Sequence, residues 1–242
     1  MEHLPDEATS PQAAARPASL SLVDALRTTG AVREFTDQAV DDAVLARVLD
    51  TARFAPSGAN AQAWRVVVVK DAANRRRLRE CYLRGSRDYL ALAAAGLRPW
   101  APTSDRQAEA RALAAGNPGA VGDFAEKFDE VPALLALFAD LSMLAAVDRD
   151  ADRYTFAGGA SIYPFAWTVL LAARDEGLGG VITTIAIREE GEVKAILGAP
   201  DHMALAAVIA LGHPVRQRRR LRRQPVSRFT TVDSLDGPAF GV

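Results

Sequence analysis

The chain has 242 residues, of which 49% are hydrophobic and 24% are charged, and its formal net charge is -1. These values are typical of one large globular domain or two small ones, and they exclude a global attraction to nucleic acid or to an acidic membrane. Cys81 is the only cysteine, so an intrachain disulfide and a multi-cysteine metal site are excluded as well. The three histidines are too scattered to suggest the spacing of metal ligands.

The N-terminal region is expected to be a tail followed by a short helix. Residues 1–19 are polar and rich in alanine and proline, which predicts a flexible segment without the apolar centre of a signal peptide. No apolar run is long enough to cross a bilayer, so we expect a cytoplasmic protein that contacts no membrane. The first helix should begin after Ser21, a good N-cap, and end near Gly30.

A clearer helix and a strand follow. Apolar residues up to Ala52 recur with helical periodicity after Asp41 or Asp42, either of which can cap the helix, and Pro56 ends it. Residues 64–69 form a β-branched run that is typical of a buried strand. Residues 72–83 are again expected to be helical.

The second half of the chain alternates helices and strands after an irregular segment. Residues 84–130 have a looser pattern, with short helical pieces broken by prolines and glycines, and an insertion of this kind often forms the lid of a binding site. Beyond it, strands are expected at 132–139, 181–187 and 204–211, with a long helix at 160–176. Strands separated by helices predict a sheet with helices packed on it.

The first segment with binding chemistry is 27–35. It holds Arg27 and Arg33 around Thr28, Thr29 and Gly30. The planar fork of an arginine suits a phosphate or a polarised carbonyl. A solvated helix end is the plainer interpretation, and this segment alone favours it.

The second segment with binding chemistry is 55–64. Ser57, Asn60 and Gln62 lie in a turn that follows Pro56 and precedes a strand. Amide side chains both donate and accept hydrogen bonds, and a loop before a rigid strand can present them to a ligand. The alternative is a connection that is simply rich in turn-forming residues.

A third segment, 177–184, holds three glycines in four positions. Glycines allow a backbone to approach a flat ligand closely. The segment follows a helix and precedes a strand, which is the reverse of a dinucleotide fingerprint. A tight structural turn is the alternative.

Taken together, these segments are more specific than any one of them. Arg33-Glu34-Phe35 precedes Ala-Pro-Ser-Gly-x-Asn-x-Gln-x-Trp-Arg by about twenty residues, Gly177-Leu178-Gly179 follows a helix, and 211–214 and 223–226 lie near the C-terminus. This combination resembles the nitroreductase family of flavoproteins over residues 20–228, with 84–130 as the variable substrate-pocket segment and 229–242 as a C-terminal tail. The resemblance implies an α+β fold, in which helices flank a central mixed, mainly antiparallel sheet, and a domain-wrapped homodimer.

The resemblance also implies FMN at the subunit interface and NADH or NADPH as the electron donor. Arg33 should lie near the pyrimidine edge of the flavin, where positive charge favours hydride acceptance, and Thr184 should lie near the reactive ring. The loop of the second segment would line the flavin, partly across the dimer, and the C-terminal arginines would reach its phosphate. The implied cofactor-binding residues are Arg27, Thr28, Thr29, Arg33, Pro56, Ser57, Asn60, Gln62, Ile182, Thr183, Thr184, Arg222 and Arg223.

One departure from the family pattern concerns the phosphate. Thr29, Gly30 and Ala31 stand where the family usually carries Arg-Arg-Ser. We expect Arg27 or the C-terminal arginines to replace this run, with a hydroxyl from a neighbouring threonine. Seven arginines in the thirteen residues 216–228 also raise the question of nucleic-acid binding. No recognised reader motif accompanies them, so we favour a solvated arm that wraps the partner subunit, with one or two of its arginines on the flavin phosphate.

The expected reaction is a two-step hydride transfer through FMN to a small electron-poor acceptor such as a nitroaromatic or a quinone, with no catalytic side chain and no metal. The alternatives are another flavin reaction on the same fold, such as dehydrogenation, reductive dehalogenation or flavin fragmentation, and a non-catalytic flavin-binding protein. Tyr89, Phe124 and Phe128 are candidates for the substrate pocket. Trp64, Phe165, Trp167 and Cys81 are expected to pack in the core.

Overall fold

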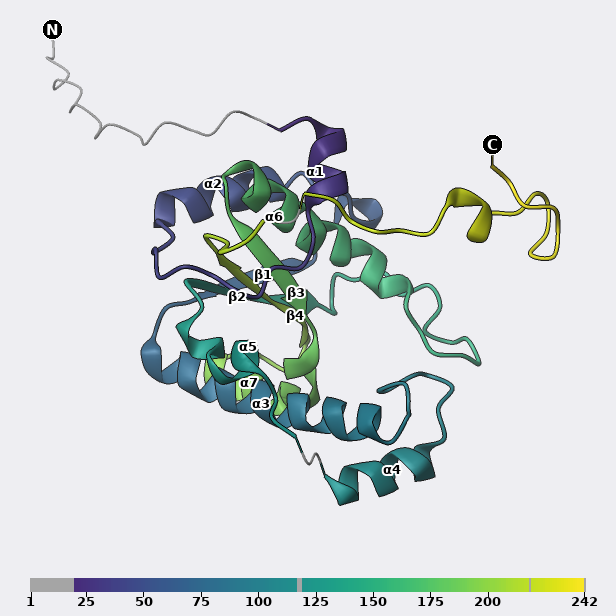
Figure 1. Cartoon of the computed structure of the whole chain (residues 1–242), viewed down its shortest axis with the longest axis horizontal. Coiled ribbons are helices and arrows are strands. Elements are labelled where there is room, and N and C mark those ends of the chain that lie inside the picture. Colours follow the sequence, from purple (N-terminus) through teal and green to yellow (C-terminus); the bar gives the residue numbers. More distant parts are fainter. Residues whose placement is uncertain (1–19, 117–118, 218, 242) are drawn as a thin grey trace, which may run out of the picture.

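The centre of the fold is a sheet with helices on both faces (Figure 1). The computed structural model describes residues 20–116, 119–217 and 219–241, so the tail expected at 1–19 lies outside the described residues. The strands are β1 (Trp64–Val69), β2 (Ala133–Asp140), β3 (Gly179–Thr183) and β4 (Met203–Gly212). Their order is β1-β2-β4-β3, and every neighbouring pair is antiparallel. A parallel contact occurs at the isolated bridge between Ala31 and Gly180.

One face of the sheet is covered by the helices near the top of Figure 1. Side chains alternate along a strand, and Leu135 and Leu137 of β2 point into this layer, where they share a core with Val48, Phe165 and Val169. The helices here are α1 (Leu22–Thr28), α2 (Asp42–Ala52) and α6 (Tyr163–Asp175), with short 3-10 helices η1 (Gly58–Asn60) and η3 (Ala157–Ser161). The helices expected after Ser21 and between residues 42 and 52 are confirmed.

The other face is covered by helices in the lower half of Figure 1. Leu134 and Phe138 of β2 pack here against Leu78, Phe128 and Val193. The elements are α3 (Ala72–Ala94), α5 (Asp123–Glu126), α7 (Glu190–Leu197), η2 (Phe128–Glu130) and η4 (Ile185–Glu189), and α4 (Arg106–Ala115) lies beyond the end of α3. Cys81 is buried in this layer, as expected.

The structure corrects the expected boundary at residue 84. Helix α3 runs on to Ala94, well into the segment that was expected to be irregular. Gly85 lies in the part of α3 that contacts η4, where a Cβ would lie 2.7 Å from the backbone oxygen of Ile185. The absence of a side chain at residue 85 therefore lets α3 lie directly against η4.

The expected strand 181–187 is wrong at both ends. β3 begins at Gly179 and ends at Thr183, and the chain then turns into η4 and α7. The β-branched residues of this stretch favour a strand by local preference. Packing of η4 against α3 overrides that preference beyond Thr184.

Beyond β4 the chain leaves the layers and runs outward as an arm (Figure 1). The arm contains the 3-10 helix η5 (Val226–Arg228) and a bridge between Thr231 and Ala239. Phe229 is 66% exposed and Leu235 is 99% exposed, so these apolar side chains are not buried within this chain. In the described part of the chain, no helix has both the length and the apolar character that a bilayer requires.

Candidate functional site

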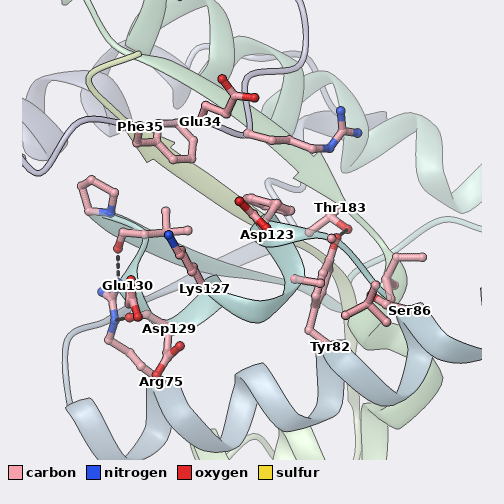
Figure 2. Close-up of a pocket in the computed structure, with 18 of the residues that line it drawn as sticks. Glu34, Phe35, Arg75, Tyr82, Ser86, Asp123, Lys127, Asp129, Glu130 and Thr183 are labelled. Carbon is pink, nitrogen blue, oxygen red and sulfur yellow. Dashed lines mark hydrogen bonds between the residues drawn. The ribbon is translucent and has the colours of Figure 1, made fainter. Parts of the chain in front are cut away.

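A large cavity of about 1470 Å³ opens beside β3. The segment 33–37 forms one side, α3 and α5 form the other, and residues 182–185 close it at the sheet. Figure 2 shows Glu34 and Phe35 on one side of this hollow and Tyr82 and Ser86, from α3, across it. The cavity thus joins four segments that are distant in the sequence.

Tyr82 forms part of the cavity wall and is anchored by stacking. Its ring stacks on Phe128 at a centroid distance of 4.2 Å and meets the edge of Phe124 at 5.8 Å. Thr183 donates a hydrogen bond from Oγ1 to the Tyr82 hydroxyl over 3.4 Å. Burial raises the pKa of Tyr82, and the Thr183 bond and the positive charge of Arg33 partly offset that rise. The phenol therefore stays protonated at neutral pH and can donate a hydrogen bond.

Arg75 fixes the far end of the cavity. Its guanidinium donates to the backbone oxygens of Asp129 at 2.8 Å, Val69 at 3.2 Å and Val131, and Figure 2 shows Arg75 close to Asp129 and Glu130. Burial lowers the pKa of Arg75, although an arginine remains charged at any physiological pH. These bonds tie η2 to the start of α3 and to the end of β1.

A second cavity, of about 1230 Å³, adjoins the first. Arg33, Glu34 and Val215 line both cavities. Its charged lining consists of five arginines and one carboxylate, so the wall is strongly cationic. These residues are Arg33, Arg174, Arg216, Arg219, Arg220 and Glu34.

Four of the expected cofactor-binding residues line the first cavity. They are Arg33 from the 27–35 segment and Ile182, Thr183 and Thr184 from the end of β3. The structure therefore brings these two sequence-predicted segments together.

The glycines of the third segment have a packing role in this chain. A Cβ at Gly179 would lie 2.8 Å from Val32, and one at Gly180 would lie 2.6 Å from the backbone oxygen of Ala210. Gly177 has a φ of 80°, which suits the end of a helix. The alternative interpretation, a tight structural turn, describes Gly177–Gly180 better than ligand access does.

The loop with Pro56, Ser57, Asn60 and Gln62 lies elsewhere in the chain. Its flanking residues Ala55 and Ala63 belong to the core on the other face of the sheet, and none of the four lines either cavity. Ser57 accepts a hydrogen bond from the Gln62 backbone N–H at 3.0 Å. Ala59, Asn60 and Gln62 all have positive φ values, of 51°, 53° and 49°. Such strained, exposed backbone at non-glycine residues is characteristic of functional loops.

The residues expected at a phosphate are dispersed in this chain. Arg27 is exposed on α1, and the Thr28 hydroxyl donates to the backbone oxygen of Asp24 at 2.7 Å. Thr29 is buried, and its Oγ1 has no hydrogen-bond partner among the described residues. Arg222 and Arg223 are exposed on the outer arm and line neither cavity.

Sequence reasoning missed several residues of the two cavities. Tyr82 and Ser86 lie within an expected helix or just beyond it. Arg174 ends the helical run 170–174 that matches the family pattern but was given no role, and Gln217 belonged to no motif. Of the aromatic pocket candidates, Tyr89 and Phe124 line the first cavity. Phe128 is instead fully buried, and its ring stacks on that of Tyr82. Trp64 stacks on Phe165 at 4.8 Å within the core, as expected.

Comparison with known proteins agrees with this architecture. A "NADH dehydrogenase" of Thermus thermophilus is 32% identical over 197 residues, covering 81% of this chain and 88% of that protein. A 5,6-dimethylbenzimidazole synthase of Rhodospirillum rubrum is 29% identical over 213 residues, covering 81% and 88%. Iodotyrosine deiodinase 1 of Mus musculus is 26% identical over 217 residues, covering 89% and 70%.

Solved structures of the same fold include bound-flavin complexes. An oxidised iodotyrosine deiodinase with FMN and 3-iodo-L-tyrosine matches with a TM-score of 0.61 and 22% identity, over 87% of this chain and 100% of that one. A Desulfovibrio desulfuricans protein in complex with FMN matches with a TM-score of 0.59 and 20% identity, over 86% and 94%. The family model described as "Nitroreductase family" matches residues 26–213. This chain therefore belongs to the nitroreductase family.

Proposed function

We propose that this chain is an FMN-dependent oxidoreductase that takes hydride from NADH or NADPH and reduces electron-poor acceptors such as nitroaromatics or quinones. The observation that carries the proposal is the position of Arg33, which lines the first cavity together with Ile182 and Thr184. These are the two segments at which the family resemblance places the flavin ring. The relatives whose solved structures contain FMN share the fold.

The residues present fit an FMN molecule in size and in charge. The first cavity, about 1470 Å³, exceeds the roughly 300–1,000 Å³ that is common for small-molecule sites, so it has room for a tricyclic ring and a second molecule. The adjoining cavity offers arginines for a phosphate. When bound, FMN supplies the uptake and release of hydride, a chemistry that side chains lack.

The side chains of the first cavity stabilise charge and position ligands. Arg33 holds a permanent positive charge at the rim, where it would stabilise negative charge that develops on a bound electron acceptor. The Tyr82 hydroxyl receives a bond from Thr183, which leaves its own proton available to a ligand. Tyr89 and Phe124 add aromatic surface at the wall, against which a flat substrate can pack.

The proposal includes a homodimer, because one chain holds only part of the expected site. Asn60 and Gln62 lie in a loop on the other face of the sheet, outside the cavity that Arg33 and Thr184 line. A second copy related by twofold symmetry can supply this loop to the first copy's cavity. The exposed side chains Phe229 and Leu235 on the outer arm are suited to burial against such a partner.

The experiment is an absorption spectrum of the purified protein, followed by release and identification of the flavin. NADH and NADPH oxidation is then measured with added FMN against a panel of quinones, nitroaromatics, enones and halophenols. Flavin-dependent turnover of quinones or nitroaromatics supports the proposal. A protein that binds no flavin and oxidises neither nicotinamide would contradict it. The panel also tests the alternative reactions that the deiodinase and synthase relatives bring into consideration.

A further inference from the structure

The second cavity has the composition of an anion site. Five arginines and one carboxylate line it. Among the described residues, Arg174, Arg216 and Arg219 form no ion pair with a carboxylate. Arginines gathered on one wall repel one another unless an anion lies between them. The excess of positive charge therefore points to a ligand with negative charge.

Unsatisfied polar atoms occur in the same wall. The Nε of Arg174 and the Oε1 of Gln217 are both buried and have no hydrogen-bond partner among the described residues. Gln217 is held in place because its Nε2 donates to the backbone oxygen of Thr28 at 3.4 Å. Buried polar groups without partners are uncommon in folded proteins and each one requires an explanation. A ligand that bears both a phosphate and hydroxyl groups would meet a cation and an acceptor in this wall.

The two cavities lie side by side. Arg33, Glu34 and Val215 line both, so a flavin whose planar ring lies in the first cavity has the second beside it for its phosphate-bearing chain. An arginine fork binds a phosphate through two parallel hydrogen bonds. The residues at 29–31, where the family usually carries Arg-Arg-Ser, are Thr29, Gly30 and Ala31 and offer no cation.

We propose that Arg174 at the end of α6, together with Arg216, Arg219 and Arg220, forms the binding site for the terminal phosphate of the flavin. These arginines would replace the Arg-Arg-Ser run that is absent at residues 29–31. This inference rests on the proposed function. It goes beyond the expectation drawn from the sequence, which assigned the phosphate to Arg27 or to the C-terminal arginines, because it adds Arg174 and favours residues 216–220 over Arg222 and Arg223. In this chain the cations that bind the phosphate would thus come from the end of α6 and from residues 216–220 after β4, and not from residues 29–31.

The test compares the dissociation constants of FMN and riboflavin, which differ only in the phosphate. Protein freed of flavin is titrated with each, and flavin fluorescence is followed. We expect the wild type to bind FMN more tightly than riboflavin. Arg174→Gln should weaken FMN binding by about tenfold or more, the loss expected for a charged hydrogen bond, and leave riboflavin binding unchanged. Arg77→Gln, an exposed position on α3 outside both cavities, serves as the matched control and should change neither constant.

A second variant guards against a folding defect at the half-buried Arg174. The double substitution of the exposed Arg219 and Arg220 by glutamine should also reduce the preference for FMN, and inorganic phosphate should compete with FMN but not with riboflavin. The proposed phosphate site is contradicted if these variants leave the preference for FMN over riboflavin unchanged. It is also contradicted if only Arg222→Gln and Arg223→Gln reduce that preference. A wild type that binds neither flavin refutes the proposed function instead.

Discussion

Arg33 lies where the two cavities meet, and its charge has a distinct role at each side. In the first cavity its positive charge partly offsets the rise that burial causes in the pKa of Tyr82, and in the second it adds to the cationic wall. Its side chain is exposed and forms no ion pair among the described residues. A charged group left free at a cavity rim is available to a ligand.

Substitution of Arg33 tests whether that charge assists electron transfer. Arg33→Gln removes the charge and keeps much of the side-chain length, so we expect kcat/KM for NAD(P)H-dependent reduction to fall by about a hundredfold, as for loss of an oxyanion-stabilising donor. Arg33→Lys retains the charge and should lose less. The bound flavin's reduction potential, measured by dye equilibration, should become more negative in Arg33→Gln. Equal losses in both variants, with an unchanged potential, would assign Arg33 to shape rather than charge.

Tyr82 illustrates a residue whose ring and hydroxyl have separable contributions. The ring stacks on Phe128, whereas the hydroxyl accepts a long hydrogen bond from Thr183 and also interacts with Ser86. Tyr82→Phe should therefore lower the free energy of unfolding by only about 1 kcal/mol, and Tyr82→Ala by about 3–5 kcal/mol. Urea denaturation of the two variants measures both values. A Tyr82→Phe variant as unstable as Tyr82→Ala would show that the hydroxyl, not the stacking, holds this wall.

Site residues that belong to a family motif could be located from the sequence. Site residues that only tertiary packing brings to a cavity could not. Arg33 and Thr184 were placed by the family pattern, and both line the first cavity. Tyr82 had only its position in an expected helix, and helical periodicity does not identify which of its residues meets a cavity. Arg174 was part of a helix end, and its facing partners come from a segment about forty residues later in the chain.

At the scale of elements, the contact of α3 with η4 depends on Gly85. A Cβ at this residue would lie 2.7 Å from the Ile185 backbone oxygen, so the two elements would have to separate. Gly85→Ala should lower the free energy of unfolding by about 1–3 kcal/mol, the range for overpacking. Thermal unfolding followed by circular dichroism measures the effect. Because Ile185 also borders the first cavity, flavin affinity should fall in the same variant.

Gly191 in α7 provides the matched control for Gly85. A Cβ at Gly191 would have no heavy atom within 4 Å, and the residue is helical. Gly191→Ala should therefore raise the free energy of unfolding by about 0.5–1 kcal/mol. If both alanine variants were stabilised, the close packing of α3 on η4 would not limit stability.

The loop between β2 and α6 is held by a carboxylate whose pKa is depressed. Asp148 accepts hydrogen bonds from the backbone N–H groups of Phe156 and Ala157 and pairs with Arg153 at 2.8 Å. The bond from Phe156 is the largest cause, and together these contacts lower the pKa from its ordinary value of 3.8 to about 2. The stabilisation is thus complete above pH 4 or so and is lost as the pH falls through about 2.

Hydrogen exchange provides the measurement for this loop. With exchange rates corrected for their intrinsic pH dependence, the peptide 145–157 should lose protection between about pH 4 and pH 2, while β2 keeps its protection longer. Asp148→Asn cannot ionise, so its loop should be less protected at neutral pH and show no further loss on acidification. A wild-type loop with constant protection down to pH 2 would be inconsistent with the role given to Asp148.

Elements with strong local patterns were predicted well, and those set by tertiary contacts were not. The strand at 64–69 and the helix at 42–52 match β1 and α2 because their periodicity is clear and turn residues bound them. Helix α7 was missed, since Glu190-Gly191-Glu192 carries little apolar signal before Val193. The stretch after Thr183 has the residue preferences of a strand, but it packs as a 3-10 helix against α3, α7 and β4.

At the scale of the whole molecule, the chain alone separates two segments that the family pattern places around one flavin. Arg33 and Thr184 line the first cavity, whereas the loop with Asn60 and Gln62 is flanked by Ala55 and Ala63, which belong to the core on the other face of the sheet. No local sequence signal reports which copy of a loop completes which site. The sequence did not predict the course of the outer arm either, because its Phe229 and Leu235 are exposed and no core of this chain fixes their position.

Hybrid dimers distinguish a shared site from a site within one chain. Arg33→Gln and Gln62→Ala should each inactivate a homodimer. When the two variants are co-produced with different affinity tags, a mixed dimer with a shared site has one intact site and one doubly altered site. Random pairing then restores about a quarter of the wild-type activity to the mixture, and tandem-tag purification should raise this to about half. If both residues serve the site of their own chain, every site carries a substitution and the mixed dimer stays inactive. Activity of the purified hybrid therefore decides whether Gln62 acts across the interface.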